Sequence, residues 1–121
     1  MIYVDATVYG PRGGKRIRLA LDTAATLTQL TPTVVSAIGY TALDSHGPAS
    51  VQSAVGRERG YRLYVGRFES LGFGFPCFEV FVNRLGGVAR DMDGLLGLNF
   101  LRSFNYEVRS IEGRILVERA A

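Results

Sequence analysis

The sequence has one cysteine, one histidine and no tryptophan, and lysine, glutamine and asparagine are scarce. The single cysteine, Cys77, excludes an intrachain disulfide, so the fold depends on its core, and we expect this thiol to be buried and inert. The single histidine, His46, stands in a Gly-Pro loop with no second histidine or cysteine cluster nearby. We therefore predict no metal site and no cofactor, and we expect His46 to be a solvated loop residue.

Long hydrophobic runs are also missing. No stretch reaches the roughly eighteen apolar residues of a membrane span, and the N-terminus lacks the apolar segment and cleavage site of a signal peptide. We expect no membrane contact within this chain and a cytoplasmic location. Because a strand pattern begins almost at once, at Ile2, the alternative is a domain excised from a longer or anchored protein.

Charge of one sign is not concentrated anywhere. The net charge of +3 comes mainly from arginines spread along the chain. The one local cluster, Arg57, Arg59 and Arg62, is too small for a nucleic-acid footprint, so we expect no nucleic-acid partner. Asp91 and Asp93 lie two residues apart, and we expect them to cap the chain or pair with arginines rather than to bind a metal ion.

The residues that are abundant favour β structure. Fifteen glycines, seven phenylalanines and six tyrosines, with many valines, leucines and isoleucines, are typical of short strands joined by turns. At 121 residues and 47% hydrophobic content, the chain is predicted to form one compact, mostly β domain over residues 1–121.

The local patterns predict where the elements lie. We expect strands at 2–9, 15–21, 61–65, 66–71, 75–82, 104–109 and 114–118. A short helix is predicted at 33–38, after Thr31 as N-cap and Pro32, and another near 98–102. Residues 22–30, 44–50 and 83–92 are expected to be loops, and the small, polar and glycine-bearing residues 51–60 a mobile hairpin.

Asp22 stands at the end of an alternating apolar run. Ile17, Leu19 and Leu21 fall on one face at a period of two, which leaves Asp22 where the strand gives way to a loop. That loop begins Asp22-Thr23-Ala24-Ala25, and Asp93-Gly94-Leu95-Leu96-Gly97 follows much later. Taken alone, Asp22-Thr23 is equally an Asx-type turn, and Gly94 to Gly97 is more often a buried strand.

The two motifs in this order resemble the retropepsin-like aspartic proteases, in particular the single-domain bacterial-type members. The resemblance spans nearly the whole chain and includes an N-terminal hairpin, the Asp-Thr-Ala-Ala loop, a glycine-bearing hairpin at the flap position, and an apolar-apolar-Gly segment before a helix. It implies a closed β-barrel or sandwich with one or two short helices. Because only one such Asp loop is present, it also implies a symmetric homodimer in which each subunit supplies one Asp22.

The resemblance also implies the roles of individual residues. Asp22 would be catalytic, and Thr23 would bond to the opposite subunit's loop. The supporting residues would be Thr23, Ala24 and Ala25 in the active-site loop and, packed beneath it, Gly94, Leu95, Leu96 and Gly97. The flap near 49–60 would contact substrate through Val51, Ser53, Ala54, Val55 and Gly56, although a plain surface hairpin is the alternative.

The chemistry of such a site follows from its two carboxylates. Two apposed carboxyl groups that share one proton can serve as base and acid, so that activated water hydrolyses a peptide bond. The pair titrates as a coupled unit, and we expect activity in acid to near-neutral conditions. A peptide or protein substrate would bind extended, as an added strand beneath the flap hairpins.

Ala24 departs from the resemblance, because the family usually has glycine there. A Cβ restricts φ and fills space that the bound peptide approaches. Two alternatives to an aspartic endopeptidase therefore stay open. One is a catalytically weak or inactive dimeric module of the same fold that binds peptides or proteins; the other is an unrelated, monomeric β-barrel binding module.

Overall fold

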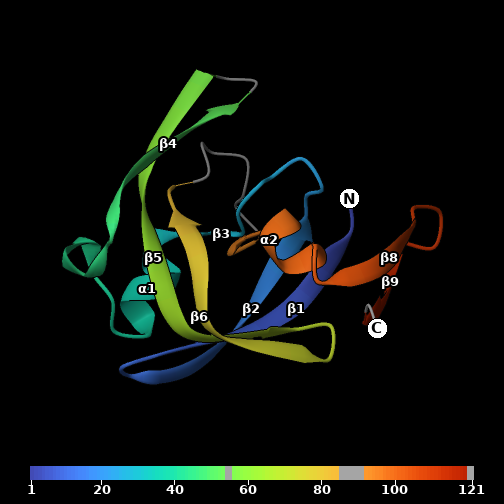
Figure 1. Ribbon diagram of the computed structural model, residues 1–121, viewed down its shortest axis with the longest axis horizontal. Helices are drawn as coiled ribbons and strands as arrows, with labels where there is room; N and C mark the ends of the chain where they lie inside the picture. Colours follow the sequence, from blue (N-terminus) through green and yellow to red (C-terminus); the bar gives the residue numbers. More distant parts are fainter. Residues whose placement is uncertain (54–55, 85–91, 120–121) are drawn as a thin grey trace.

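The computed structural model describes residues 1–53, 56–84 and 92–119, with backbone alone between 49 and 58 (Figure 1). Within these ranges the chain is mostly β structure, as predicted. The strands are β1 (Tyr3–Gly10), β2 (Gly13–Leu21), β3 (Gln29–Leu30), β4 (Gly47–Ser53), β5 (Gly56–Ser70), β6 (Phe73–Val82), β7 (Gly94–Leu96), β8 (Phe104–Arg109) and β9 (Arg114–Arg119). The helices are α1 (Pro32–Ala37), α2 (Leu98–Leu101) and a 3-10 turn, η1 (Ala42–Asp44).

Six of the strands close into a barrel. The ring runs β1-β2-β7-β3-β6-β5 and returns to β1 through antiparallel pairing of β1 with β5, in which Ala6 lies opposite Ser70. The β2–β7 and β3–β6 pairs are parallel, and the other pairs of the ring are antiparallel. β4 lies outside the ring and pairs with β5. The predicted closed β-barrel is confirmed.

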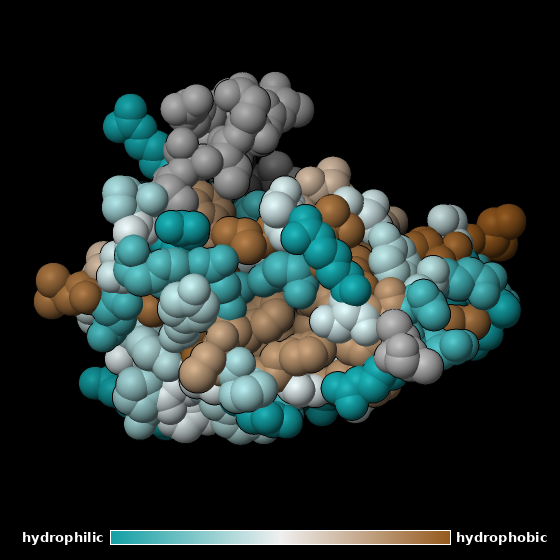
Figure 2. Space-filling model, viewed as in Figure 1, coloured by the Kyte–Doolittle hydropathy of each residue, from teal (hydrophilic) through white to brown (hydrophobic). Residues whose placement is uncertain are grey.

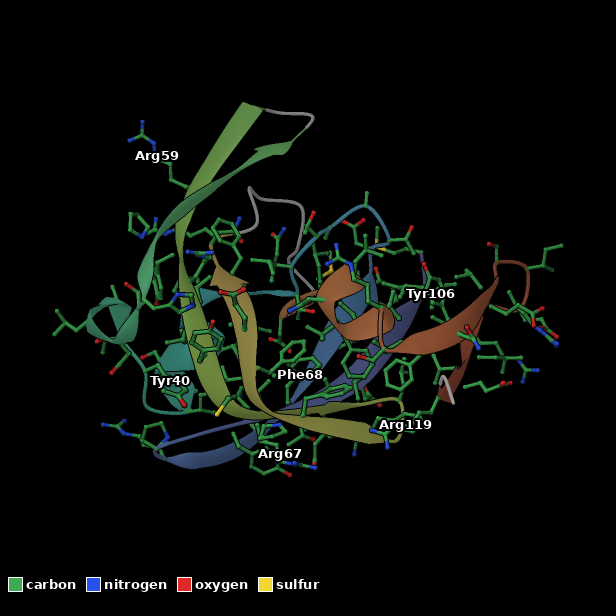
Figure 3. The ribbon with its side chains drawn as sticks, in the orientation of Figure 1. Tyr40, Arg59, Arg67, Phe68, Tyr106 and Arg119 are labelled. Atoms are coloured by element: carbon green, nitrogen blue, oxygen red, sulfur yellow. The ribbon has the colours of Figure 1, made fainter. Side chains whose placement is uncertain are left out.

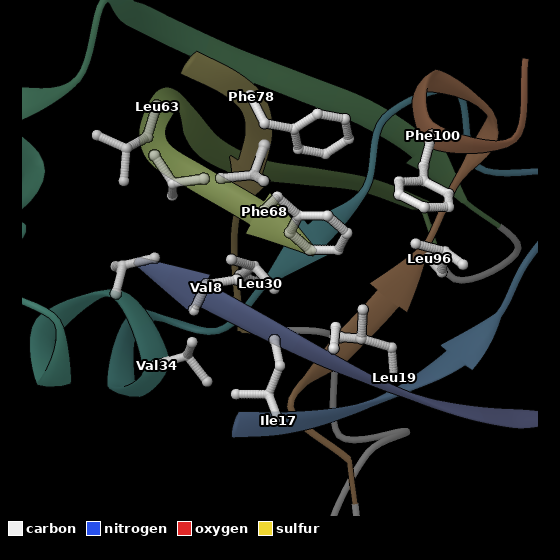
Figure 4. Close-up of a cluster of buried hydrophobic side chains, with 14 of the residues drawn as sticks. Val8, Ile17, Leu19, Leu30, Val34, Leu63, Phe68, Phe78, Leu96 and Phe100 are labelled. Carbon is white, nitrogen blue, oxygen red and sulfur yellow. The ribbon is translucent and has the colours of Figure 1, made fainter. Parts of the chain in front are cut away.

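Alternation along the strands fills the barrel. Val4, Ala6 and Val8 of β1 point inward with Ile17 and Leu19 of β2, and all five are buried (Figure 4). Their polar neighbours in sequence face outward, which is the period of two that the sequence shows.

Aromatic rings join β5, β6 and α2 inside the barrel. The Phe68 ring centroid lies 4.7 Å from that of Phe78 and 5.6 Å from that of Phe100 (Figure 4). Phe68 and Phe100 are fully buried. Such pairs add about 0.5–1.5 kcal/mol each to the free energy gained by burial, so this cluster fixes α2 against the strands.

Helix α1 confirms the predicted helix and its caps. The Thr31 hydroxyl accepts a hydrogen bond from the Val34 amide, and Pro32 is the first helical residue. The helix is followed by Gly39 with φ of +101°, a conformation that glycine adopts without a steric penalty.

Strand β5 corrects the prediction of two strands at 61–65 and 66–71, because it is continuous. Gly66 is a point of close approach and not a break. Its amide donates to the Tyr40 hydroxyl at 3.0 Å, and a Cβ at this position would lie 3.2 Å from the Tyr9 carbonyl oxygen of the crossing strand β1.

The short β3 and the start of β4, up to residue 50, were expected to be loops, whereas the end of β4 falls in the predicted hairpin. β4 begins with Gly47 and Pro48, which have low strand propensity, but Pro48 is tolerated because β4 is an edge strand. β3 is only two residues long and pairs with both β6 and β7. Most of the predicted loop 83–92 falls outside the described residues.

The expectation that Cys77 is buried is wrong. The thiol is exposed, because Phe78 and Val80 of β6 point into the barrel and Cys77 alternates with them to the outside.

The hairpin of β8 and β9 forms a second, two-stranded sheet and extends away from the barrel (Figure 1). Phe104 at its base contacts Phe73, with ring centroids 4.6 Å apart, and the Arg119 guanidinium lies 5.5 Å from the centre of the same Phe73 ring (Figure 3). In the described part of the chain, no helix has the length and apolar character needed to cross a membrane.

Candidate active site

Asp22 lies where the sequence predicts, immediately after β2. Its amide donates to the Leu96 carbonyl oxygen at 3.0 Å, which continues the parallel pairing of Leu21 with Leu96. The preceding Leu21 amide donates to the Ile2 carbonyl oxygen at 2.8 Å. The backbone of the candidate catalytic residue is therefore tied to the barrel on two sides.

The loop after Asp22 is a tight turn. The Asp22 Oδ1 atom accepts a hydrogen bond of 2.9 Å from the Ala24 amide, and its carbonyl oxygen accepts one of 3.2 Å from the Ala25 amide. This is the Asx-type turn that the sequence leaves open, and it orients the carboxylate. Asp22 is partly exposed, Thr23 and Ala24 are exposed, and Ala25 is buried.

A buried polar network supports this loop. The Thr28 side chain is fully buried; its hydroxyl donates to the Asn99 Oδ1 atom at 2.9 Å and accepts from the Gly97 amide at 3.1 Å. The Thr28 amide donates to the same Asn99 oxygen at 2.8 Å. The Asn99 Nδ2 atom donates to the Glu79 carbonyl oxygen at 2.8 Å, so three distant segments meet at one amide side chain.

Sequence reasoning missed Thr28 and Asn99. The available signal was Asn99 itself, a polar residue within the apolar stretch from Leu95 to Leu101. A polar side chain at such a position is expected to need buried hydrogen-bond partners.

The segment from Gly94 to Gly97 lies directly against the loop. A Cβ on Gly97 would lie 2.7 Å from the Leu27 carbonyl group and 2.8 Å from the Ala25 carbonyl oxygen, so only glycine fits. A Cβ on Gly94 would overlap the Gln29 carbonyl oxygen. Leu96 is fully buried and Leu95 partly buried.

The start of α2 also holds the loop. The Leu98 amide donates to the Ala25 carbonyl oxygen at 2.8 Å, and the Asn99 amide donates to the Thr26 carbonyl oxygen at 3.1 Å. The loop and the Gly-Leu-Leu-Gly segment are thus one unit.

Asp93 bonds to the backbone of β2. Its Oδ2 atom accepts from the Arg18 amide at 3.0 Å, and its own amide donates to the Arg18 carbonyl oxygen at 2.8 Å. Asp91 lies outside the described residues. Within the described ranges, no group of three or more His, Cys, Asp or Glu side chains could hold a metal ion.

The hairpin predicted at the flap position is formed by β4 and β5. Its pairing runs from Gly47 opposite Arg62 to Ser53 opposite Gly56. In the view of Figure 1, the end of β4, the start of β5 and the loop after β2 all lie toward the top. Val51, Ser53 and Gly56 belong to the paired backbone, whereas Ala54 and Val55 lie outside the described residues.

A hollow of about 460 Å³ lies elsewhere, between β1 and the β5–β6 turn. Its charged groups pair with one another, as Arg16 with Asp5 at 3.0 Å and Arg67 with Glu69 at 2.8 Å. The Asp22 carboxylate does not line this hollow; it lies at the end of β2, in the loop that the buried Thr28–Asn99 network supports.

Comparison with known proteins agrees with this geometry. A family model described as aspartyl protease matches residues 4–100. A retropepsin-like aspartic protease from Rickettsia conorii, known from its crystal structure, is similar with a TM-score of 0.70 and 19% sequence identity, over 97% of this chain and 88% of that one. A search of the curated proteins returns no match. The family model matches most of this chain, and the fold is shared with a retropepsin-like enzyme. The chain therefore belongs to the aspartyl protease family and has a retropepsin-like fold.

Proposed function

We propose that the protein is an aspartic endopeptidase whose catalytic pair is formed by Asp22 of two identical subunits. The observation that carries this proposal is the fixed position of Asp22, with its amide bonded to Leu96 and its Oδ1 atom to the Ala24 amide. The exposed Thr23 beside it is available to a second subunit.

The two Asp22 carboxyl groups together act as base and acid in the reaction. One carboxylate takes a proton from water as the water oxygen bonds to the peptide carbonyl carbon. The C–N bond of the resulting tetrahedral intermediate then breaks as the pair donates a proton to the leaving nitrogen. The β4–β5 hairpin closes over an extended peptide or protein substrate, which adds to the exposed edge of β4 or to the loop as a strand.

The β8–β9 hairpin supports the proposal of a homodimer. Tyr106 and Val108 lie on the same face as the buried Phe104 but are 40% and 38% exposed, with Val117 and Ile115 opposite them. Figure 2 shows hydrophobic residues at the surface of this end of the molecule, at the right of the view. Two strands alone are marginally stable in water, and a second copy would extend the sheet and cover its apolar face.

The test is cleavage of a mixed peptide library between about pH 4 and 7 by the protein and by Asp22→Asn, which keeps the side-chain shape and removes the ionisable pair. Asp5→Asn is a control, because Asp5 is an exposed carboxylate on β1. We expect cleavage by the parent and by the control, and a loss of at least about a hundredfold in Asp22→Asn. Equal cleavage by all three proteins would contradict the proposal.

The second candidate is a dimeric module that binds peptides or proteins without cleaving them, and Ala24 is the observation that favours it. Ala24 is exposed in the loop where substrate would lie. Absence of cleavage at concentrations where the protein is dimeric would support this candidate, and Ala24→Gly would then be the next variant. A single domain over residues 1–121 and a cytoplasmic location stay predictions.

A further inference from the structure

The hollow beside β1 takes no part in the proposed cleavage. It has a volume of about 460 Å³, within the range of ligand sites, and is lined by residues of β1, β2, β5 and β6 and of the β5–β6 turn. Arg67, one of the lining residues, lies at the bottom of Figure 3, whereas Arg59 of the β4–β5 hairpin lies at the top. A ligand in this hollow would therefore be recognised by residues other than those of the candidate active site.

One row of side chains crosses four neighbouring strands in the hollow. Thr7 of β1 lies opposite Arg16 of β2 and also opposite Glu69 of β5, and Glu69 lies opposite Gly74 of β6. The next residue along β1, Val8, is buried in the barrel, so the row faces outward. Because neighbouring strands are about 4.8 Å apart, the backbones of Arg16 and Glu69 lie on either side of Thr7, about 10 Å from each other.

Two glycines allow flat side chains to turn toward Glu69. A Cβ on Gly74 would overlap the Arg67 guanidinium, with its Cζ atom 2.9 Å away, and a Cβ on Gly14 would lie 2.7 Å from the Tyr9 ring. The Tyr9 hydroxyl donates to the Glu69 Oε1 atom at 2.9 Å, and the Arg67 Nε atom donates to Oε2 at 2.8 Å. Each carboxylate oxygen of Glu69 thus has a donor, and the Arg67 guanidinium has a defined position.

These contacts leave hydrogen-bond donors unused in the hollow. Within the described residues, no hydrogen bond engages the Thr7 hydroxyl or the two Nη atoms of Arg67. Arg16 contacts Asp5 through its Nη2 atom alone, at 3.0 Å. A guanidinium has five N–H donors in a planar fork, and that fork matches the two oxygens of a carboxylate. The hollow therefore offers two partly used guanidinium groups on the strands that flank a free hydroxyl.

The charges in the hollow favour an anion that carries a single charge. Asp5 pairs with Arg16, and Glu69 pairs with Arg67, so the four groups balance one another. A doubly charged anion would be repelled by the two carboxylates that are already present, and this repulsion is smaller for a singly charged carboxylate.

We propose that the hollow binds a carboxylate group of a peptide. The Nη atoms of Arg67, the Thr7 hydroxyl and the free N–H groups of Arg16 donate to its two oxygens. The carboxylate comes from a free C-terminus or from an acidic side chain, because both present the same planar group. The site does not rest on the proposed cleavage, since no step of that reaction uses it.

The test is a titration followed through the backbone amide signals of Thr7, Arg16 and Glu69 in NMR spectra, at pH 7.5 and constant ionic strength. The probes are acetyl-Ala-Ala with a free carboxylate, its C-terminal amide, acetyl-Asp-amide and inorganic sulfate. We expect saturable shifts with a Kd of about 1–10 mM for at least one of the two carboxylate probes. We expect none with acetyl-Ala-Ala-amide, and binding of sulfate that is at least about threefold weaker.

Three variants show whether the named donors hold the carboxylate. Arg67→Gln is expected to raise the Kd at least about tenfold, and Thr7→Val, which keeps the β-branched shape, about threefold. Arg114→Gln is the control, because Arg114 is an arginine of β9 that pairs with Glu112 outside the hollow, and its Kd should not change. Glu69 keeps the Tyr9 hydroxyl in Arg67→Gln, and that variant is expected to fold, which the dispersion of its amide signals checks.

The carboxylate that binds more tightly identifies its source, and either source supports the site. Equal shifts with acetyl-Ala-Ala and its amide, tighter binding of sulfate than of both carboxylates, or the same Kd in Arg67→Gln and Arg114→Gln would overturn the proposal. So would binding that is lost in Asp22→Asn, because the carboxylate would then lie at the candidate active site. If the parent binds carboxylates in the hollow but cleaves no peptide, the proposed protease is wrong and this site stands.

Discussion

Asn99 is the residue on which the candidate site depends most. Its side chain bonds to the Thr28 amide, the Thr28 hydroxyl and the Glu79 carbonyl oxygen at 2.8–2.9 Å. These groups come from the loop after Asp22 and from β6, so a single amide fixes the loop relative to the barrel.

Replacing Asn99 by alanine removes these three hydrogen bonds and leaves the buried Thr28 amide and hydroxyl proton without their acceptor. We expect Asn99→Ala to lower the free energy of unfolding by about 2–3 kcal/mol, measured by urea denaturation. Asn105→Ala is the matched control, because Asn105 is exposed on β8, and its effect should stay within about 0.5 kcal/mol. Equal losses in both variants would show that the network does not stabilise the loop.

Glu69 makes the stability of the folded state depend on pH. The Arg67 guanidinium, followed by the Tyr9 hydroxyl, holds the pKa of this carboxyl below its ordinary value through hydrogen bonds of 2.8 and 2.9 Å. A lowered pKa in the folded state means that Glu69 contributes stability above its ordinary pKa of about 4.3. That contribution is lost as the pH falls through the lower, folded pKa.

The melting temperature measured against pH tests this linkage. The difference in Tm between the parent and Glu69→Gln is expected to be largest near pH 6 and to shrink as the pH falls to 3 and below. Glu118→Gln, at an exposed site on β9, should show no such trend. A constant difference for Glu69→Gln at all pH values would refute the linkage.

At the scale of elements, the β8–β9 hairpin offers a sharp test of self-association. Val108 and Leu116 are both 38% exposed, but Val108 shares the apolar face with Tyr106 whereas Leu116 pairs with Glu107 on the other face. We expect Val108→Lys to weaken dimerisation at least about tenfold, because burying an unpaired charge is costly, and Leu116→Lys to weaken it much less. Sedimentation equilibrium measures both. Equal effects of the two variants would show that the apolar face of the hairpin is not part of the dimer interface.

The elements also show what sequence patterns can and cannot predict. Helix α1, the first hairpin and the β8–β9 hairpin carry their own caps, turns or alternation, so they were predicted nearly to the residue. The start of β4 was not, because Gly47 and Pro48 become strand only through pairing with β5. Position in the barrel outweighs local propensity at such an edge.

Only the part of the candidate site that follows a local sequence pattern was predictable. Asp22 follows a local pattern, a strand that ends in a polar loop. Thr28 and Asn99 are joined across 71 positions of sequence, and His46, just before β4, contacts Glu79 of β6 across the intervening strand β5. No periodicity encodes such contacts, so only the folded chain reveals them.

At the scale of the whole molecule, the proposed active site needs two copies of the chain. The rate of peptide cleavage must therefore depend on the protein concentration. We expect the rate per subunit to be constant well above the dissociation constant of the dimer and to fall in proportion to concentration far below it. Initial rates across a dilution series, with Asp22→Asn as the blank, measure this. A rate per subunit that never falls, down to concentrations at which sedimentation shows monomers, would mean that one copy suffices.

The closure of the barrel separates the strands that form the core from the β4–β5 hairpin that is proposed to cover the substrate. The ring of six strands is complete through the pairing of β1 with β5, and β5 pairs with β6 only from Tyr61 onward. In the described residues, the part of β5 before Tyr61 pairs with β4 and takes no part in the ring. Descendants of this sequence can therefore lengthen, shorten or exchange that stretch while inheriting an unchanged barrel, so that new preferences can evolve without a new fold.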